Sequence, residues 1–180
     1  MDALKDIHTG LGTLGLPLHI SMNPNVTPIQ AQPHRYPVAK EAKASDAICD
    51  LEKQGILKKV TEPPAWISNS VYREKPDGSI RVCIDPSQTI NKAIEVPKYH
   101  ILTVDELLPK LNNAKIFSCV DVYKGFTNIE LSDSSSFLIT MHTPIGHYRW
   151  LHMLFGISLG LEEYQRRQQE PLEGLTSVVN

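Results

Sequence analysis

The sequence predicts an α+β fold in which an antiparallel sheet packs against a small number of helices. Two hairpin patterns carry this prediction, one around Pro76-Asp77-Gly78 and the other around Pro144-Ile145-Gly146. Helix-favouring segments precede, separate and follow the hairpins, unlike the repeated strand–helix alternation of a parallel sheet. With 180 residues and 41% hydrophobic content, the chain is long enough to form one globular domain.

The N-terminal part of the chain predicts an extended or loose arm followed by a helix. The stretch before residue 38 has few periodic apolar positions and contains Pro17, Pro24, Pro28, Pro33 and Pro37. From residue 38 onward, one helical face carries the apolar residues Ala44, Ala47, Ile48 and Leu51, and Gly55 stands where a C-terminal cap is expected. We therefore expect an extended arm over residues 1–32 and an amphipathic helix starting near residue 38.

The middle of the chain predicts a hairpin and then a short helix. Residues 66–85 form two strand-like runs around the first turn, and the second run ends near Asp85. Thr103 followed by Glu106 indicates a capping box, so a helix should run to about residue 111. Pro109 is expected to bend or shorten that helix.

The last third of the chain predicts a strand, a hairpin and a helix. Residues 114–123, AKIFSCVDVY, alternate as a strand does and place Asp121 near its far end. The second hairpin should pair residues 136–143 with residues 146–153. The polar segment 161–175 favours a helix.

Composition limits the classes of function. The formal net charge of −2 and the pI near 6.4 provide no overall basic field, so any nucleic-acid contact must come from a local patch. Cys49, Cys83 and Cys119 are widely spaced and odd in number, which fits neither a disulfide framework nor a zinc site. We expect a reducing intracellular setting, without a signal peptide or membrane span.

Two classes of enzyme are disfavoured by the motifs. A serine or cysteine hydrolase is unlikely, because the sequence has no Gly-X-Ser-X-Gly elbow and its histidines do not accompany a nucleophile. Zinc chemistry is also disfavoured. His142, His147 and His152 lack a cysteine partner or an HExxH motif.

Six consecutive blocks resemble the polymerase of gypsy-class LTR retrotransposons, a reverse transcriptase of retrovirus-like Pol. In order and spacing, these blocks are EKQGILKKV, REKPDGSIRVCIDP, INKAI, LPKLNNAKIFSCVDVYKGF, HTPIGHYRWLHMLFGIS and EEYQRR. The resemblance covers about residues 33–178. It implies the fingers and part of the palm of a right-hand polymerase, without a thumb. The fingers would comprise residues 33–96 and 129–159, and the palm residues 97–128 and 160–180.

The resemblance also implies an activity and its partners. The family carries out RNA-directed DNA polymerisation on a template–primer with deoxynucleoside triphosphates, using two Mg²⁺ ions. Asp121 matches the first catalytic aspartate and metal ligand, and the carbonyl of Val122 would face a metal ion. From its spacing alone, Asp121 is more readily interpreted as a strand-end aspartate that caps a turn.

Further residues match nucleotide-binding positions of the family. Lys75 and Arg81 would hold the triphosphate, and Phe126 would exclude the ribose 2′ hydroxyl. Phe155 and Gly156 match the block that packs beneath the nucleotide. Without the resemblance, Lys75 and Arg81 would be interpreted as solvated surface charges and Phe126 as a core aromatic. Phe155 and Gly156 would be interpreted as a strand-to-helix bend. Nucleic-acid contacts are expected from Arg73, Arg166 and Arg167.

The sequence also departs from the family pattern. The aromatic-X-Asp-Asp motif that supplies the remaining carboxylate is not among the 180 residues, which contain no two adjacent aspartates. The resemblance therefore predicts a chain truncated before this motif, with an incomplete Mg²⁺ site and no catalysis on its own. Ser87 replaces a family arginine and Gly160-Leu161 replaces Ala-Pro, as in a decayed or diverged copy.

Two non-catalytic alternatives remain. One is a nucleic-acid-binding module with a phosphate track made of Lys58, Lys59, Arg73, Lys75, Arg81, Arg166 and Arg167. The other is a partner-binding fragment. If the strand that carries Asp121 lacked its neighbour, its open edge would favour association or aggregation.

Overall fold

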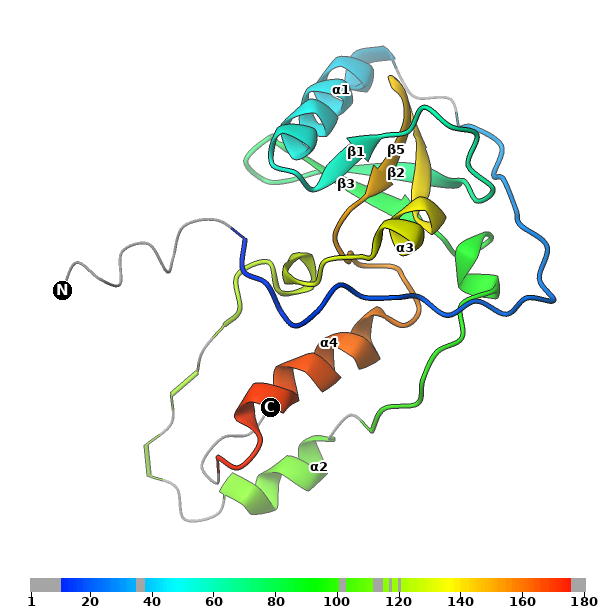
Figure 1. The fold of residues 1–180 in the computed structure, drawn as a ribbon. Coiled ribbons are helices and arrows are strands. Elements are labelled where there is room, and N and C mark those ends of the chain that lie inside the picture. The colour runs from blue at the N-terminus through cyan, green and yellow to red at the C-terminus, as the bar shows by residue number, and fades with distance from the viewer. Residues whose placement is uncertain are drawn as a thin grey trace.

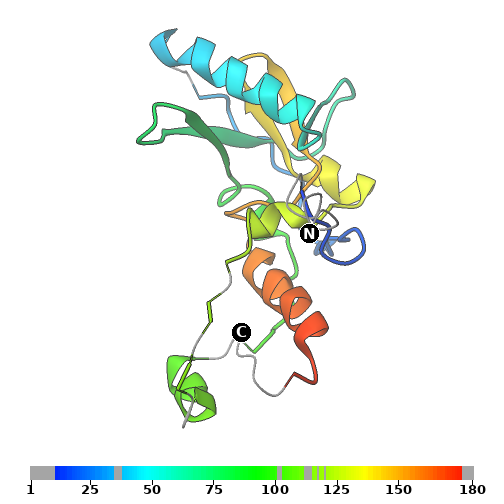
Figure 2. The same ribbon diagram turned by 90° about the vertical axis from the view of Figure 1, so that its left-hand side faces the viewer.

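A five-stranded mixed sheet lies at the centre of the computed structural model, with strand order β1-β5-β4-β2-β3. The strands are β1 (Leu57–Lys59), β2 (Ser68–Glu74), β3 (Ile80–Asp85), β4 (Thr140–Thr143) and β5 (Gly146–Trp150). The structure describes residues 11–34, 38–100, 103–111, 115–116, 118–119 and 121–175. Figure 2 shows the sheet at one end of the molecule and the helices α2 and α4 at the other.

Both predicted hairpins form, but the sheet is mixed rather than antiparallel. β2 pairs antiparallel with β3, and β4 pairs antiparallel with β5. The hairpins join through β2 and β4, which run parallel with Ser68 opposite Met141 and Asn69 opposite His142. A tight turn fixes the direction of two consecutive strands, whereas packing alone decides how two distant hairpins join. The fully antiparallel prediction was therefore wrong at this junction.

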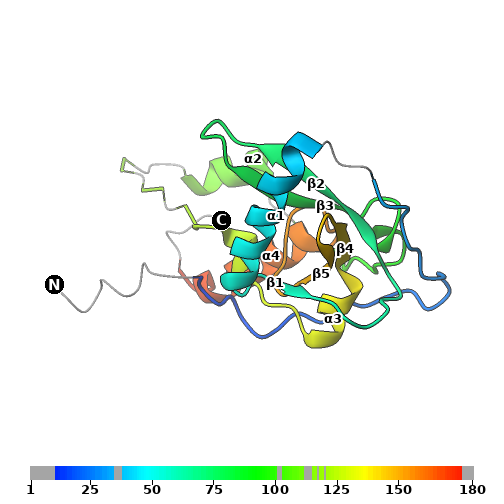
Figure 3. The ribbon, with the colours of Figure 1, turned by 90° about the horizontal axis from the view of Figure 1, so that it is seen from above.

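Helix α1 (Val38–Lys53) covers one face of the sheet, as predicted (Figures 1 and 3). Ala44 and Ile48 are fully buried on its inner face. The helix is followed by Gly55 at φ 73°, and the amide of Ile56 donates to the carbonyl of Leu51. This left-handed glycine ends the helix and turns the chain directly into β1, a short strand that the sequence analysis did not predict.

The second hairpin begins later than predicted, because part of its first strand is helical. Residues 133–138 form α3 (Asp133–Leu138), and the strand starts only at Thr140. The hydroxyl of Ser132 accepts from the amide of Ser135 and caps the helix. A serine N-cap before a short polar run was the signal that favoured helix here.

No strand is formed by the described residues of segment 115–123, so this prediction was wrong for those residues. Lys115, Ile116, Ser118 and Cys119 are exposed coil, and the side chain of Ile116 is 89% exposed. Alternating side chains predict a strand only where another strand can pair with its backbone. Among the described residues, none pairs with this segment.

Within residues 11–34 the N-terminal arm is extended, as predicted, but it packs closely against the rest of the chain. Leu18 and Ile20 are buried in the core, and isolated bridges pair Leu18 with Leu131 and Met22 with Ile94. The segment, dark blue in Figure 1, runs across the molecule beneath the sheet. Residues 11–32 therefore belong to the folded domain rather than to a loose lead-in.

The remaining helices agree with the sequence prediction. The short helix is α2 (Val104–Leu107), which continues past Pro109 as the 3-10 turn η3 (Leu108–Leu111). One half of the capping box forms, in which the Glu106 carboxylate accepts hydrogen bonds from the amide and the hydroxyl of Thr103. The last helix is α4 (Gly160–Gln169), which continues as η5 (Glu170–Leu172). Two further 3-10 turns are η2 (Ile90–Lys92) and η4 (Gly125–Asn128).

Candidate nucleotide-binding site

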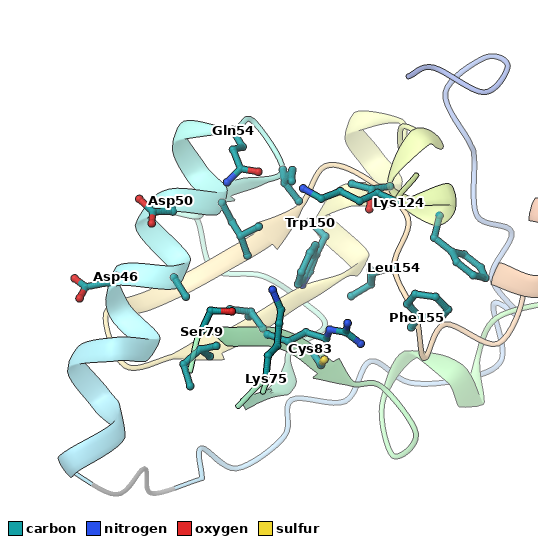
Figure 4. Close-up of a pocket in the computed structure, with 18 of the residues that line it drawn as sticks. Asp46, Asp50, Gln54, Lys75, Ser79, Cys83, Lys124, Trp150, Leu154 and Phe155 are labelled. Carbon is teal, nitrogen blue, oxygen red and sulfur yellow. The ribbon is translucent and has the colours of Figure 1, made fainter. Parts of the chain in front are cut away.

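A pocket of about 990 Å³ opens between α1, the β2–β3 hairpin and the segments around residues 122–127 and 150–155 (Figure 4). Trp150 and Leu154 line its interior, and Lys75 reaches toward it from the hairpin. Five residues that the sequence analysis selected for nucleotide or metal binding line this one pocket: Lys75, Arg81, Val122, Phe126 and Phe155. They come from parts of the sequence as far apart as residues 75 and 155, so only the fold brings them together.

The β2–β3 turn supplies the basic wall of the pocket. Gly78 at φ 78° allows a tight turn in which its amide donates to the carbonyl of Lys75. The amide and hydroxyl of Ser79 donate to Asp77, and these hydrogen bonds hold the pKa of the Asp77 carboxyl below its usual value. The turn thus places Lys75 and Arg81 on either side of a conformationally defined loop.

The basic wall is also crowded with like charge. Arg73 and Arg81 face each other across β2 and β3, and both are exposed. Among the described residues, no ion pair engages Arg73, Lys75 or Arg81. Cations directly opposite each other repel, which favours an anion between them.

Three aromatic rings form the opposite side of the site. The ring centroid of Phe126 lies 4.4 Å from that of Phe155 and 5.0 Å from that of Tyr164, which stacks on it. Phe126 and Tyr164 are partly buried, whereas the Phe155 side chain is 71% exposed. Phe126 therefore packs against two other rings, and Phe155 is the ring most exposed to solvent.

Tyr164 is a site residue that the sequence analysis missed, although it lies in a block used for the resemblance. A Cβ atom at Gly125 would lie 2.4 Å from the Tyr164 hydroxyl oxygen, so the glycine makes room for the tyrosine ring. Burial raises the pKa of the Tyr164 hydroxyl, and the charge of Asp121 raises it further.

Gly156 adopts a conformation that favours glycine. Its φ is 101°, and a Cβ atom would contact the carbonyl oxygen of Ile84 and the ring of Pro86, both at 3.5 Å. The turn after Phe155 therefore passes close to the end of β3.

Asp121 and Val122 are both exposed, and Val122 lines the pocket whereas Asp121 does not. Within the described part of the chain, no group of three or more His, Cys, Asp or Glu side chains could hold a metal ion. Asp121 and the carbonyl of Val122 supply only a fraction of the octahedral oxygen shell of Mg²⁺. The described residues therefore do not fit a two-ion site.

Arg166 and Arg167 lie away from the basic wall and have protein partners. Both bond the carboxylate of Glu163, with Arg167 Nε at 2.6 Å and Arg166 Nη2 at 2.8 Å from Glu163 Oε1. Burial alone would raise the pKa of Glu163, but the hydrogen bonds from the two guanidinium groups outweigh burial and lower it. Arg167 also donates to the carbonyls of Leu14 and Leu16, and its side chain is only 7% exposed. It is therefore not available on the surface for a phosphate.

Comparison with solved structures identifies the class of fold. A crystal structure of prototype foamy virus protease–reverse transcriptase superposes with a TM-score of 0.76 at 19% identity, covering 90% of this chain and 21% of that one. A foamy viral protease–reverse transcriptase in complex with an RNA/DNA hybrid gives a TM-score of 0.73 at 17% identity, covering 94% and 22%. The chain therefore has a retroviral reverse transcriptase-like fold, of α+β class.

Sequence comparison identifies the relatives. The Pol polyprotein of transposon 297 from Drosophila melanogaster is 30% identical over 157 residues, which is 82% of this chain and 14% of the polyprotein. The enzymatic polyprotein of cauliflower mosaic virus (strain Strasbourg) is 29% identical over 145 residues, covering 79% and 21%. No family model matches the chain.

The chain is therefore homologous to part of retrovirus-related Pol polyproteins and has the fold of a retroviral reverse transcriptase, as the sequence blocks indicated. It spans 14% and 21% of the length of these two relatives. In the described residues, no helix combines the length and the apolar character needed to cross a bilayer.

Proposed function

We propose that this chain forms the nucleotide-binding part of an RNA-directed DNA polymerase, with fingers over residues 33–96 and 129–159 and palm over residues 97–128 and 160–180. The observation that carries the proposal is the shared pocket, in which a basic hairpin faces an aromatic stack. An incoming nucleotide has the matching chemistry. Its triphosphate requires cations, and its sugar and base require apolar surfaces.

Each wall of the pocket has a role in this proposal. Lys75 and Arg81 bind the triphosphate, and Arg73 adds positive charge at the template side. Phe126 stands against the sugar and excludes a 2′ hydroxyl, because the rings of Phe155 and Tyr164 prevent it from moving away. Phe155 and Gly156 form the surface beneath the nucleotide. The family's template–primer is the expected macromolecular partner.

We also propose that these 180 residues do not extend a primer by themselves. Asp121 is the single carboxylate that matches the family's catalytic carboxylates, with the Val122 carbonyl as a neighbouring ligand. In the family, bound Mg²⁺ stabilises the attacking and leaving oxygens. Here, Asp121 and Val122 mark one side of that site, and we assign no reaction step to them.

Binding of a fluorescent deoxynucleoside triphosphate tests the proposal. We expect the chain to bind it, and Arg81→Ala to weaken binding about ten- to hundredfold, because a charge-assisted hydrogen bond contributes about 1.5–3 kcal/mol. The matched control is Lys58→Ala, which removes an exposed cation from β1 at the opposite edge of the sheet. A folded chain that binds no nucleotide, or that loses equal affinity in both variants, would contradict the proposal.

Primer extension on oligo(dT)-primed poly(rA) tests the catalytic part separately. We expect no extension from the wild-type chain or from Asp121→Asn. Extension that disappears in Asp121→Asn would mean that another group completes the metal site.

A second candidate is a nucleic-acid-binding module, favoured by the cations that remain exposed. Arg73, Lys75 and Arg81 share the β2–β3 hairpin, whereas Lys58 and Lys59 lie on β1 at the other edge of the sheet. Any phosphate track is therefore centred on the hairpin. Affinity for single-stranded DNA that falls with rising salt supports this function, and no binding at low salt excludes it.

Association with a further protein segment is a third candidate, favoured by exposed apolar side chains near the site. Ile116 is 89% exposed, Tyr123 72% and Phe155 71%. Exposed apolar side chains favour contact with another chain. A monomeric sample at high concentration by light scattering would argue against this association.

A further inference from the structure

The side chain of Asn91 connects two parts of the chain that border the pocket. Asn91 lies in η2, the single turn that follows β3. Its Nδ2 donates to the carbonyl of Gly156 at 2.7 Å, and its Oδ1 accepts from the amide of Ser158 at 3.0 Å. One amide group therefore bonds both sides of the turn that follows Phe155.

The chemistry of the partners fixes the orientation of this amide. A backbone carbonyl can only accept and a backbone N–H can only donate, so Nδ2 must face Gly156 and Oδ1 must face Ser158. A single side-chain amide offers this donor and acceptor together. An aspartate would present acceptors to both partners, and an alanine would present neither.

Asn91 is itself held on a rigid base. Its backbone amide donates to the carbonyl of Pro86, and the preceding Ile90 is fully buried. Thr89 is also buried, and its hydroxyl bonds that of Ser68 in β2. The base of Asn91 is thus tied to the sheet that carries the basic hairpin.

The turn that Asn91 bonds is also held by the buried side chains of Leu154, directly before Phe155, and Ile157. Gly156 has no side chain, and its backbone, at a φ of 101°, can adopt other conformations at little steric cost. The Phe155 side chain is largely exposed, with the ring of Phe126 at 4.4 Å. Ile157 is buried and holds the far side of the turn.

We propose that Asn91 is a positioning residue that fixes the Phe155–Gly156 turn against Phe126 and so sets the spacing between the aromatic stack and the basic hairpin. The part of this inference that concerns nucleotides rests on the proposed nucleotide-binding function. The part that concerns the position of Phe155 does not.

The first experiment measures position without any ligand. In the wild-type chain, NMR should show protection of the Ser158 amide from hydrogen exchange and a nuclear Overhauser contact between the rings of Phe126 and Phe155. We expect Asn91→Ala to lose both signals. Asn91→Asp should keep the Ser158 protection, because a carboxylate still accepts, but should weaken the ring contact by repelling the Gly156 carbonyl.

The control for this experiment is Gln30→Ala. It removes a comparable side-chain amide, which donates to the carbonyl of Pro64 at 2.8 Å in a region that does not line the pocket. We expect it to retain both NMR signals. If Asn91→Ala also retained them, the positioning inference would be overturned.

The second experiment measures affinity for a fluorescent deoxynucleoside triphosphate. We expect Asn91→Ala to weaken binding about five- to tenfold, corresponding to the loss of one or two net hydrogen bonds, and Gln30→Ala to leave it unchanged. Unchanged affinity in Asn91→Ala despite a lost ring contact would overturn the link to nucleotide binding. No binding by the wild-type chain would overturn the proposed function instead, and the NMR signals alone would then decide the positioning inference.

Discussion

Replacing each of two neighbouring arginines by methionine should have very different effects on stability, although both contact the same carboxylate. Arg166 and Arg167 both bond Glu163, but the Arg166 side chain is 43% exposed and the Arg167 side chain is 7% exposed. An exposed ion pair contributes about 0–1 kcal/mol because water screens it and offers an alternative. Breaking a buried pair costs about 3–5 kcal/mol, since it leaves polar groups without partners.

The other contacts of Arg167 raise the loss of stability expected on its replacement toward the upper end of the range for a buried pair. Its Nη1 donates to the carbonyls of Leu14 and Leu16, both at 2.6 Å, so Arg167→Met also removes hydrogen bonds that hold the N-terminal segment. We expect Arg167→Met to lower the free energy of unfolding by at least about 3 kcal/mol and Arg166→Met by less than about 1 kcal/mol.

Urea unfolding followed by circular dichroism measures both values at neutral pH. Limited proteolysis provides a second measurement, in which Arg167→Met should be cleaved faster between residues 11 and 20 than Arg166→Met. An equal loss of stability in the two variants, or a larger loss in Arg166→Met, would refute the assignment of Arg167 as the anchor of the N-terminal segment.

Three further predictions follow from the packing. Because its folded pKa is lowered, Glu163 contributes stability that is present above its unfolded pKa of about 4.5 and is lost as the pH falls through the folded pKa, so Glu163→Gln should flatten the acid side of the stability curve measured by urea unfolding. Gly125→Ala should cost about 1–3 kcal/mol by overpacking against Tyr164, and a double-mutant cycle with Tyr164→Ala should recover most of that cost; strictly additive losses would contradict the contact. Ile20→Ala should cost about 2–5 kcal/mol, whereas the control Leu16→Ala, at a position 84% exposed, should change thermal stability little.

Local patterns predicted the elements whose causes lie within a few residues. The α1 helix, both hairpin turns and the early end of α2 before Pro109 depend on spacing, glycine and proline, and all appear in the structure. The wrong predictions concern segments whose structure depends on contact with a distant part of the chain. Segment 115–123 has the alternation of a strand, but its described residues pair with no strand, and the arm has prolines but buries Leu18 and Ile20.

In the candidate site, too, the sequence identified some residues, whereas the contacts of others depend on the fold. The resemblance selected Lys75, Arg81, Phe126 and Phe155, and the fold places all four around one pocket. It also selected Arg167, whose burial against Glu163 follows from the position of α4 beneath the N-terminal segment. Tyr164 and Asn91 were missed because a single tyrosine or asparagine forms no recognisable sequence motif, and their contacts arise only in the fold.

The sequence alone indicated the similarity to retrovirus-like Pol polyproteins, the α+β class and both hairpin turns, because motifs and turn residues act through their own side chains and nearest neighbours. The tertiary structure decided which cations are exposed, which ring holds Phe126 and how the two hairpins join. These properties depend on contacts between segments far apart in the chain. Burial and pairing arise only when the fold brings those segments together.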